Sequence, residues 1–150
     1  MKRLFILFAC LVVFSCSDKE SEVSTDVNEL SEFINLPAKP LSVKWAYRRS
    51  GDGLLGPSDY AITAVIKLNE ADFKGLRTKY KLGAAHYANR TKDFVKDWFP
   101  PSVKNCIKDN GSLVSVVVWE NPKEFEKSPL VNGYCFFTNN NEVFVCMFTT

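Results

Sequence analysis

Hydrophobic and polar residues alternate in two stretches of the chain. In residues 41–47 apolar side chains occupy every second position, and the same period runs through residues 59–68. A period of two places alternate side chains on opposite faces of a strand, so both stretches are predicted to be half-buried β-strands. Residues 49–58, with the sequence RSGDGLLGPS, lie between them. The glycines and the proline of this segment predict a long hairpin loop.

Two stretches with helical periodicity follow. After Asn69, acidic residues occupy the first turn and apolar residues recur at spacings of three and four as far as Gly83. Asparagine is a good N-cap, and acidic side chains are favourable in the positive first turn of a helix. A second helix is predicted to begin near Thr91 and to end at Pro100, because proline does not continue a helix.

The last third of the chain predicts three more strands. Residues 113–119 are apolar on both faces, which is typical of a central strand covered on both sides. Residues 134–138 and 143–148 flank an asparagine-rich turn and predict a closing hairpin. The predicted order is β-β-α-α-β-β-β. We therefore expect an α+β fold, with a mostly antiparallel five-stranded sheet and the helices packed on one face.

The first 15 residues have a different pattern. Lys2 and Arg3 precede an uninterrupted apolar run at residues 4–14. This run is too short to cross the hydrocarbon core of a bilayer, for which a helix takes roughly 20 residues. A basic start and a short apolar run are typical of a secretory signal peptide. The sequence VFSC at residues 13–16 resembles the lipobox of bacterial lipoproteins, with a bulkier residue than usual at Phe14.

This resemblance implies a lipid anchor. The thiol of Cys16 would accept a diacylglycerol thioether, the signal peptide of residues 1–15 would be removed, and acyl chains such as palmitate would hold the protein at a membrane. An ordinary signal peptide with an incidental cysteine is the alternative. Residues 17–22 resemble the acidic signal that sends some lipoproteins to the outer face of the outer membrane. We expect an anchor in the bacterial outer membrane, facing either the cell surface or the periplasm.

Removing the predicted signal peptide changes the size and charge of the chain. It takes away 15 of 150 residues, and the remainder is the size of one domain. Residues 17–32 carry six acids and one lysine with few apolar residues. We therefore expect a disordered acidic tether over residues 16–32. It would carry a single α+β domain of residues 33–150, in which basic residues outnumber acids.

Positive charge gathers between Lys67 and Lys108, where ten basic residues face four acids. Such a face suits an anionic glycan, a lipid headgroup or an acidic envelope protein, whereas nucleic acid is not expected in this compartment. The alternative is that the lysines only keep a helix face soluble. The candidate binding residues are Arg77, Lys79, Tyr80, Lys81, Tyr87 and Arg90, together with Leu54 and Leu55 of the hairpin loop.

The chemistry-bearing residues form no known catalytic or metal-binding motif. His86 is the only histidine of the chain, which excludes HxxH and HExxH zinc motifs. A dyad of Cys106 with His86 would make a small secreted hydrolase, but exported thiols are more often oxidised. Asp93 and Asp97 share one helix face with lysines, which is typical of solvated charge. We expect no enzyme activity, no cofactor and no metal.

The hypothesis favoured by these features is a lipid-anchored, non-catalytic binding or accessory module of the cell envelope. One alternative is a small secreted hydrolase that uses His86 or Cys106. Another is a toxin-neutralising, immunity-like lipoprotein, for which a tethered compact domain would also serve. The segment GPSDY at residues 56–60 resembles stretches of uncharacterised bacterial proteins and adds no function.

Three cysteines remain in the predicted domain, namely Cys106, Cys135 and Cys146. A four-residue hairpin loop places Cys135 opposite Cys146, with Cα atoms about 4.5–5.5 Å apart, which suits a disulfide. A three-residue loop places Cys135 opposite Val145 and turns Cys146 to the other face. We prefer a disulfide between Cys135 and Cys146. A pairing with Cys106 and the absence of any disulfide are the alternatives.

Overall fold

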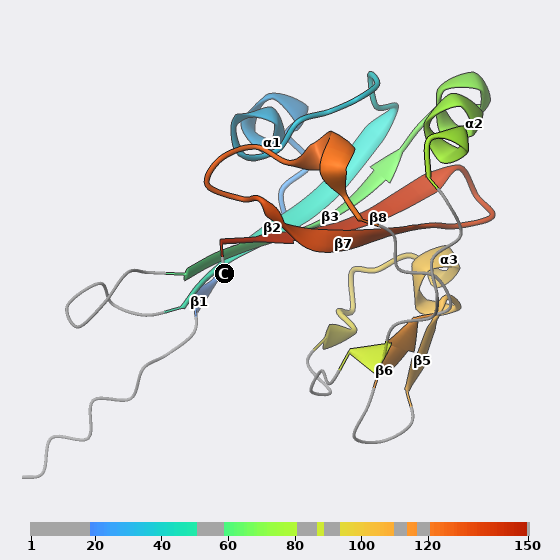
Figure 1. The fold of residues 1–150 in the computed structure, drawn as a ribbon. Helices are drawn as coiled ribbons and strands as arrows, with labels where there is room; N and C mark the ends of the chain where they lie inside the picture. Colours follow the sequence, from blue (N-terminus) through green and yellow to red (C-terminus); the bar gives the residue numbers. More distant parts are fainter. Residues whose placement is uncertain are drawn as a thin grey trace, which may run out of the picture.

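An antiparallel β-sheet forms the centre of the protein (Figure 1). The computed structural model describes residues 19–50, 59–80, 87–88, 94–109, 114–116 and 121–149. In the order across the sheet, the four long strands are β2 (Ser42–Ser50), β3 (Asp59–Lys67), β8 (Glu142–Phe148) and β7 (Asn132–Phe137). The two-residue strand β1 (Lys19–Glu20) extends the sheet at the edge of β2. The prediction of an α+β fold with a mostly antiparallel sheet is confirmed.

The predicted central strand at residues 113–119 lies elsewhere. Its described part is β6 (Val114–Val116), which pairs with β4 (Tyr87–Ala88) and β5 (Ile107–Asp109) in a separate three-stranded sheet. The prediction that this stretch completes one five-stranded sheet is therefore wrong. An apolar run indicates burial, but it carries no information on which strand lies beside it. The central position belongs to β3 and β8, which pair with each other.

Residues 19–33 pack on the domain. Ser24 and Trp45 exchange two backbone hydrogen bonds of 2.8 and 2.9 Å, so the chain continues along the edge of β2. Helix α1 (Val27–Phe33) follows, and its Leu30 is fully buried. The prediction of a disordered tether is therefore wrong for residues 19–32. Residues 16–18 of that tether, and the predicted signal peptide, lie outside the described residues.

The acidic composition of this segment is compatible with order because the acids occupy favourable positions. The carboxylate of Asp26 accepts hydrogen bonds from the backbone N–H groups of Asn28 and Glu29, at 2.7 and 3.1 Å. Asp26 is thus the N-cap of α1, and Glu29 lies in the positive first turn. The indole N–H of Trp45 donates to the carbonyl oxygen of Asp26 at 3.0 Å, which fixes the helix start against the sheet.

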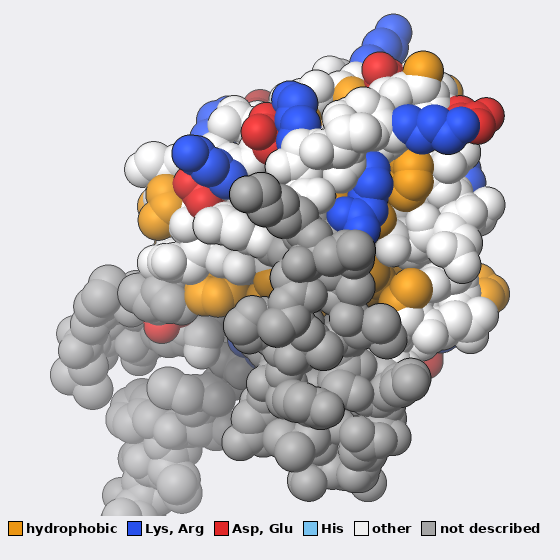
Figure 2. Space-filling view, turned by 45° about the vertical axis from the view of Figure 1, so that its right-hand side comes forward, with side chains coloured by type: hydrophobic (Ala, Val, Ile, Leu, Met, Phe, Trp, Pro, Cys, Tyr) orange, Lys and Arg blue, Asp and Glu red, His pale blue; other side chains and the backbone are white. Residues whose placement is uncertain are grey.

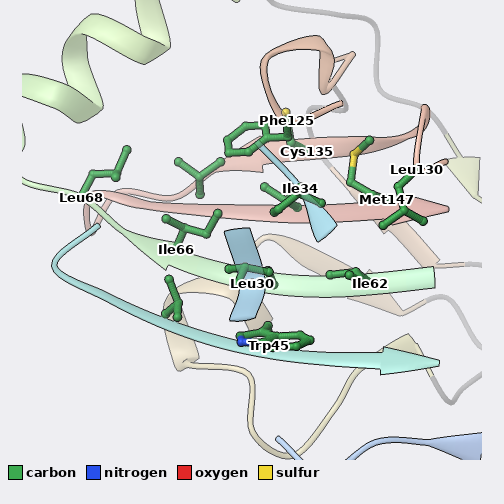
Figure 3. Close-up of a cluster of buried hydrophobic side chains, with 14 of the residues drawn as sticks. Leu30, Ile34, Trp45, Ile62, Ile66, Leu68, Phe125, Leu130, Cys135 and Met147 are labelled. Atoms are coloured by element: carbon green, nitrogen blue, oxygen red, sulfur yellow. The ribbon is translucent and has the colours of Figure 1, made fainter. Parts of the chain in front are cut away.

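Both faces of the sheet are covered, and each has its own hydrophobic core. Helices α1 and α2 (Glu70–Thr78) and the 3₁₀ helix η2 (Lys123–Phe125) lie on one face. They enclose the first core (Figure 3), whose largest members are Trp45, Phe125, Leu30, Ile34, Ile62, Ile66, Leu130 and Met147. Helix α3 (Pro101–Lys104) lies on the opposite face. The prediction that the helices share one face is wrong.

The second core lies between the sheet and residues 94–107, and aromatic rings dominate it. It consists of Val65, Phe99, Val103, Ile107, Tyr134, Phe136, Phe144 and Cys146. Phe144 of β8 stacks on Phe136 with ring centroids 4.6 Å apart and meets the edge of Phe99 at 5.3 Å. Residues 94–99, the described part of the predicted second helix, hold no α-helix. Their bends and turns bring Phe99 onto the sheet.

Candidate functional site

The basic residues predicted to bind a partner begin on helix α2. The side chain of Asn69 accepts a hydrogen bond from the backbone N–H of Asp72 at 2.9 Å, so Asn69 is the N-cap, as predicted. The helix ends at Thr78, five residues before the predicted stop. The guanidinium of Arg77 lies over the ring of Phe137, 5.0 Å from its centroid. Lys79 forms an ion pair of 3.5 Å with Glu124. Both cations therefore also contact the fold itself.

Tyr80 follows α2 and packs against the first core. Its ring meets the edge of Phe137, with centroids 5.2 Å apart. Its hydroxyl is buried next to Cys135 and the backbone of Glu124, and burial raises the pKa of this hydroxyl well above its usual range. A buried neutral phenol fits a packing role better than a role in recognising a partner.

The remaining predicted binding residues are not brought together within the described part of the chain. Lys81, Arg90, Leu54 and Leu55 lie outside the described residues, and so does His86. Tyr87 lies in strand β4, where only the backbone is described. Figure 2 shows that, over the described part of the face it displays, Lys and Arg side chains are interleaved with Asp and Glu.

The hairpin of β7 and β8 has a three-residue loop, and the cysteines lie where that loop length places them. The backbone N–H of Thr138 donates to the carbonyl oxygen of Glu142 at 2.9 Å, and β7 pairs Cys135 with Val145. Cys135 lies in the first core and Cys146 in the second. The two thiols are on opposite faces of the sheet, so the preferred disulfide is wrong. Among the three cysteines that the structure describes, no disulfide is formed.

A pocket of about 210 Å³ opens at the end of the sheet that carries β1. Its lining consists of Arg48, Ser50, Asp59, Tyr60, Ala61, Cys146, Phe148 and Thr149. The pairing of β3 with both β2 and β8 brings these residues together. The Thr149 hydroxyl donates to Asp59 at 3.3 Å and accepts from the backbone N–H of Tyr60 at 3.1 Å. The end of β8 is thereby fastened to the start of β3.

The pocket offers hydrogen-bonding groups and one deep thiol. Arg48 contributes a guanidinium and Asp59 a carboxylate, and both residues are exposed. Cys146 is 4% exposed, and its sulfur accepts a weak contact from the Thr63 hydroxyl at 3.9 Å. A guanidinium beside hydroxyl groups suits a phosphate or carboxylate group. Three or more potential metal ligands do not cluster anywhere in the described ranges.

Neither Cys106 nor Asp97, the described members of the two catalytic pairs weighed from the sequence, lines this pocket. Cys106 lies after α3, and its thiol donates to the carbonyl oxygen of Ser102 at 3.3 Å. Burial raises the pKa of the Cys106 thiol, which favours the protonated form over the nucleophilic thiolate. Asp97 is exposed, and its predicted partner Asp93 lies outside the described residues.

The pocket residues carry no recognisable signal in the sequence. Arg48 and Asp59 flank the hairpin loop, and Thr149 is 90 positions beyond Asp59 along the chain. They meet because β8 pairs with β3, a long-range contact that no local pattern encodes. The alternation of the strand at residues 59–68 did predict that Tyr60 would share a face with Ile62, and the structure places Ile62 in the first core.

Comparison with known proteins adds no relative: no protein-family profile, curated protein or solved structure matches this chain.

Proposed function

We propose that this protein is a bacterial lipoprotein, anchored in the outer membrane through Cys16, whose domain acts by binding rather than by catalysis. The observation that carries the proposal is the succession of Lys2 and Arg3, the apolar run of residues 4–14 and the sequence VFSC. A basic start and a short apolar run match an export signal. Cys16, which follows the small residue Ser15, supplies the thiol for the lipid. Acyl chains anchor by about 0.8 kcal/mol per buried CH₂. Among the described residues, no helix has the length and apolar character needed to cross a membrane.

Two features support binding over hydrolysis. The raised pKa of Cys106 works against a thiolate nucleophile at neutral pH. The hydrogen bond from its thiol to Ser102 gives Cys106 a role in fastening α3. An anionic glycan or an acidic envelope protein remains the partner chemistry that the basic region suits.

The position of α2 also favours recognition of a partner. Strand β1 lies at one end of the main sheet and α2 at the other (Figure 1). Helix α2 begins three residues after the end of β3. At this same end, the backbone N–H of Leu41 donates to the carbonyl oxygen of Lys67, with an N···O distance of 2.8 Å. A partner that approaches from the side opposite the anchor would therefore meet α2 first.

The anchor is tested by substitution of Cys16 in the full chain. Cys16→Ser should abolish incorporation of labelled palmitate and leave uncleaved precursor, because serine offers no thiol for the thioether. Cys10→Ser is the matched control, since Cys10 lies inside the apolar run and is removed with the signal peptide. Normal processing and palmitate labelling of Cys16→Ser would refute the proposal.

A further inference from the structure

The fold begins so close to Cys16 that the anchor determines which end of the domain meets the membrane. We infer that the end of the sheet formed by β1, the last residues of β2 and the first of β3 rests against the lipid headgroup layer. The inference rests on the proposed anchor at Cys16. It replaces the picture of a domain held off the membrane by an acidic tether.

Only a short length of chain lies between the anchor and the fold. Lys19 is three residues beyond Cys16. An extended chain advances at most about 3.6 Å per residue, so the two Cα atoms are separated by no more than about 11 Å. The expected tether of residues 16–32 would have allowed several times this distance.

The first described residues, 19–21, are held to the sheet by several contacts. Lys19 pairs with Arg49, and Glu20 pairs with Arg48, in the antiparallel ladder of β1 and β2. Glu20 also forms an ion pair of 2.6 Å with Lys96, which belongs to the segment that packs on the second core. The backbone N–H of Ser21 donates to the carbonyl oxygen of Tyr47 at 2.8 Å. These contacts hold the segment after Cys16 to this end of the sheet.

This end of the sheet presents arginine and tyrosine side chains to the solvent. Arg48 and Arg49 are exposed, and Tyr60 is 37% exposed. The guanidinium of Arg49 lies over the ring of Tyr60, 5.7 Å from its centroid. Guanidinium groups bind phosphate in a forked geometry, and tyrosine is enriched where an apolar medium meets water. An arginine backed by a tyrosine therefore suits a layer of phospholipid headgroups.

The charge at this end is nearly balanced, which decides how the contact depends on lipid composition. Among the residues whose side chains the structure describes at this end, the basic ones are Arg48, Arg49 and Lys96, and the acidic ones are Glu20 and Asp59. A net charge this small gives little attraction to an anionic surface. The contact therefore depends on the anchor, and protein without lipid should not associate with vesicles.

The opposite end of the same strand supplies an internal reference. Leu41, which precedes β2, is 66% exposed. At about 3.3 Å per residue, the nine residues of β2 place it roughly 30 Å from the β1 end. Tyr60 and Leu41 are thus two exposed positions at opposite ends of the sheet.

The test compares Tyr60→Trp with Leu41→Trp in the full, lipidated chain. Each variant is reconstituted in vesicles of phosphatidylethanolamine and phosphatidylglycerol that contain a lipid with a nitroxide on its headgroup. The added tryptophan should lose its fluorescence at position 60 and keep it at position 41. The wild-type protein, with its own tryptophans, supplies the background. If Tyr60→Trp unfolds at lower urea than the wild type, Arg49→Trp reports on the same end.

The outcomes separate the inference from the proposed function. Quenching at position 60 alone, together with a lipid-modified mass, supports both. Equal quenching at both positions, or none at either, in a protein of lipid-modified mass overturns the orientation and leaves the anchor intact. A protein whose mass shows no lipid overturns the anchor and the orientation with it. Vesicle binding by the chain of residues 17–150, which carries neither the lipid nor the signal peptide, would show that the domain itself is the membrane binder, against the inference.

Discussion

At the scale of single residues, two glycines show how much the surroundings decide. Gly133 lies in β7 opposite Met147. A Cβ atom at Gly133 would overlap the carbonyl oxygen of Cys146 and lie 2.9 Å from the sulfur of Met147. Gly75 lies within α2, where a Cβ atom would meet nothing within 4 Å. The first glycine is required by the close approach of two strands, whereas the second only weakens a helix.

This contrast predicts opposite effects of the same substitution. Gly133→Ala should lower the free energy of unfolding by about 1–3 kcal/mol, because the strands must separate to admit the methyl group. Gly75→Ala should raise it by about 0.5–1 kcal/mol, because alanine is the better helix former. Urea unfolding followed by circular dichroism measures both. Equal changes in the two variants would contradict the close approach at β7.

At the scale of elements, the N-terminal segment is the main departure from expectation. Its capping aspartate and one buried leucine help to fasten a short helix in a segment whose composition predicts disorder. Ile34, directly after α1, is also fully buried. Its neighbour Asn35 donates to the carbonyl oxygens of Phe125 and Glu126, at 3.1 and 2.6 Å. Helix α1 therefore belongs to the same packed unit as η2.

A substitution in α1 measures this contribution. Leu30→Ala should lower the free energy of unfolding by about 2–5 kcal/mol, the usual cost of a cavity at a fully buried leucine. Glu32→Ala, at an exposed position of the same helix, is the matched control and should change it little. Amide hydrogen exchange gives a second measure, since the backbone N–H of Ile34 bonds to Leu30. Free exchange at Ile34, or equal stability of the two variants, would restore the disordered tether.

At the scale of the whole molecule, one sheet is shared by two cores, and each core holds a titratable group in its protonated form. Burial raises the pKa of Tyr80 in the first core, where the nearby Cys135 thiol adds to the effect. Burial raises the pKa of Cys106, which packs against the second core, above its ordinary value of 9.0. Because the unfolded chain loses these protons first, folding is favoured fully below the unfolded pKa and less above it.

The protein should therefore lose stability as the pH rises above about 9. The free energy of unfolding from urea titrations should fall from about pH 9 upward, first through Cys106 and above about pH 10 through Tyr80 as well. The fall should be smaller in Cys106→Ala than in the wild type, because the variant lacks one of the two groups. Cys106→Ala also loses packing, so the comparison uses the slope with pH rather than the stability itself. Identical slopes in the two proteins would show that the Cys106 thiol is not buried from water.

Local signals in the sequence were sufficient for the elements that depend on near neighbours. The alternation at residues 59–68 indicated β3, and Asn69 marked the start of α2. The three-residue loop was one of two lengths consistent with the asparagine turn. It is completed by Asn141 with a positive φ of 54°, a conformation that asparagine tolerates. A difference of one loop residue moves Cys146 to the other face of the sheet, and local sequence does not contain that choice.

The sequence by itself determined the alternating strands of the first hairpin and the α+β class, because each depends on residues a few positions apart. Only the tertiary structure decided that β8 lies beside β3, that residues 114–116 join a second sheet, and that residues 19–33 pack on the domain. Those outcomes depend on which apolar surfaces meet across long stretches of chain. Burial of apolar surface is favourable wherever two surfaces fit together, and a local sequence pattern does not specify which surfaces will meet.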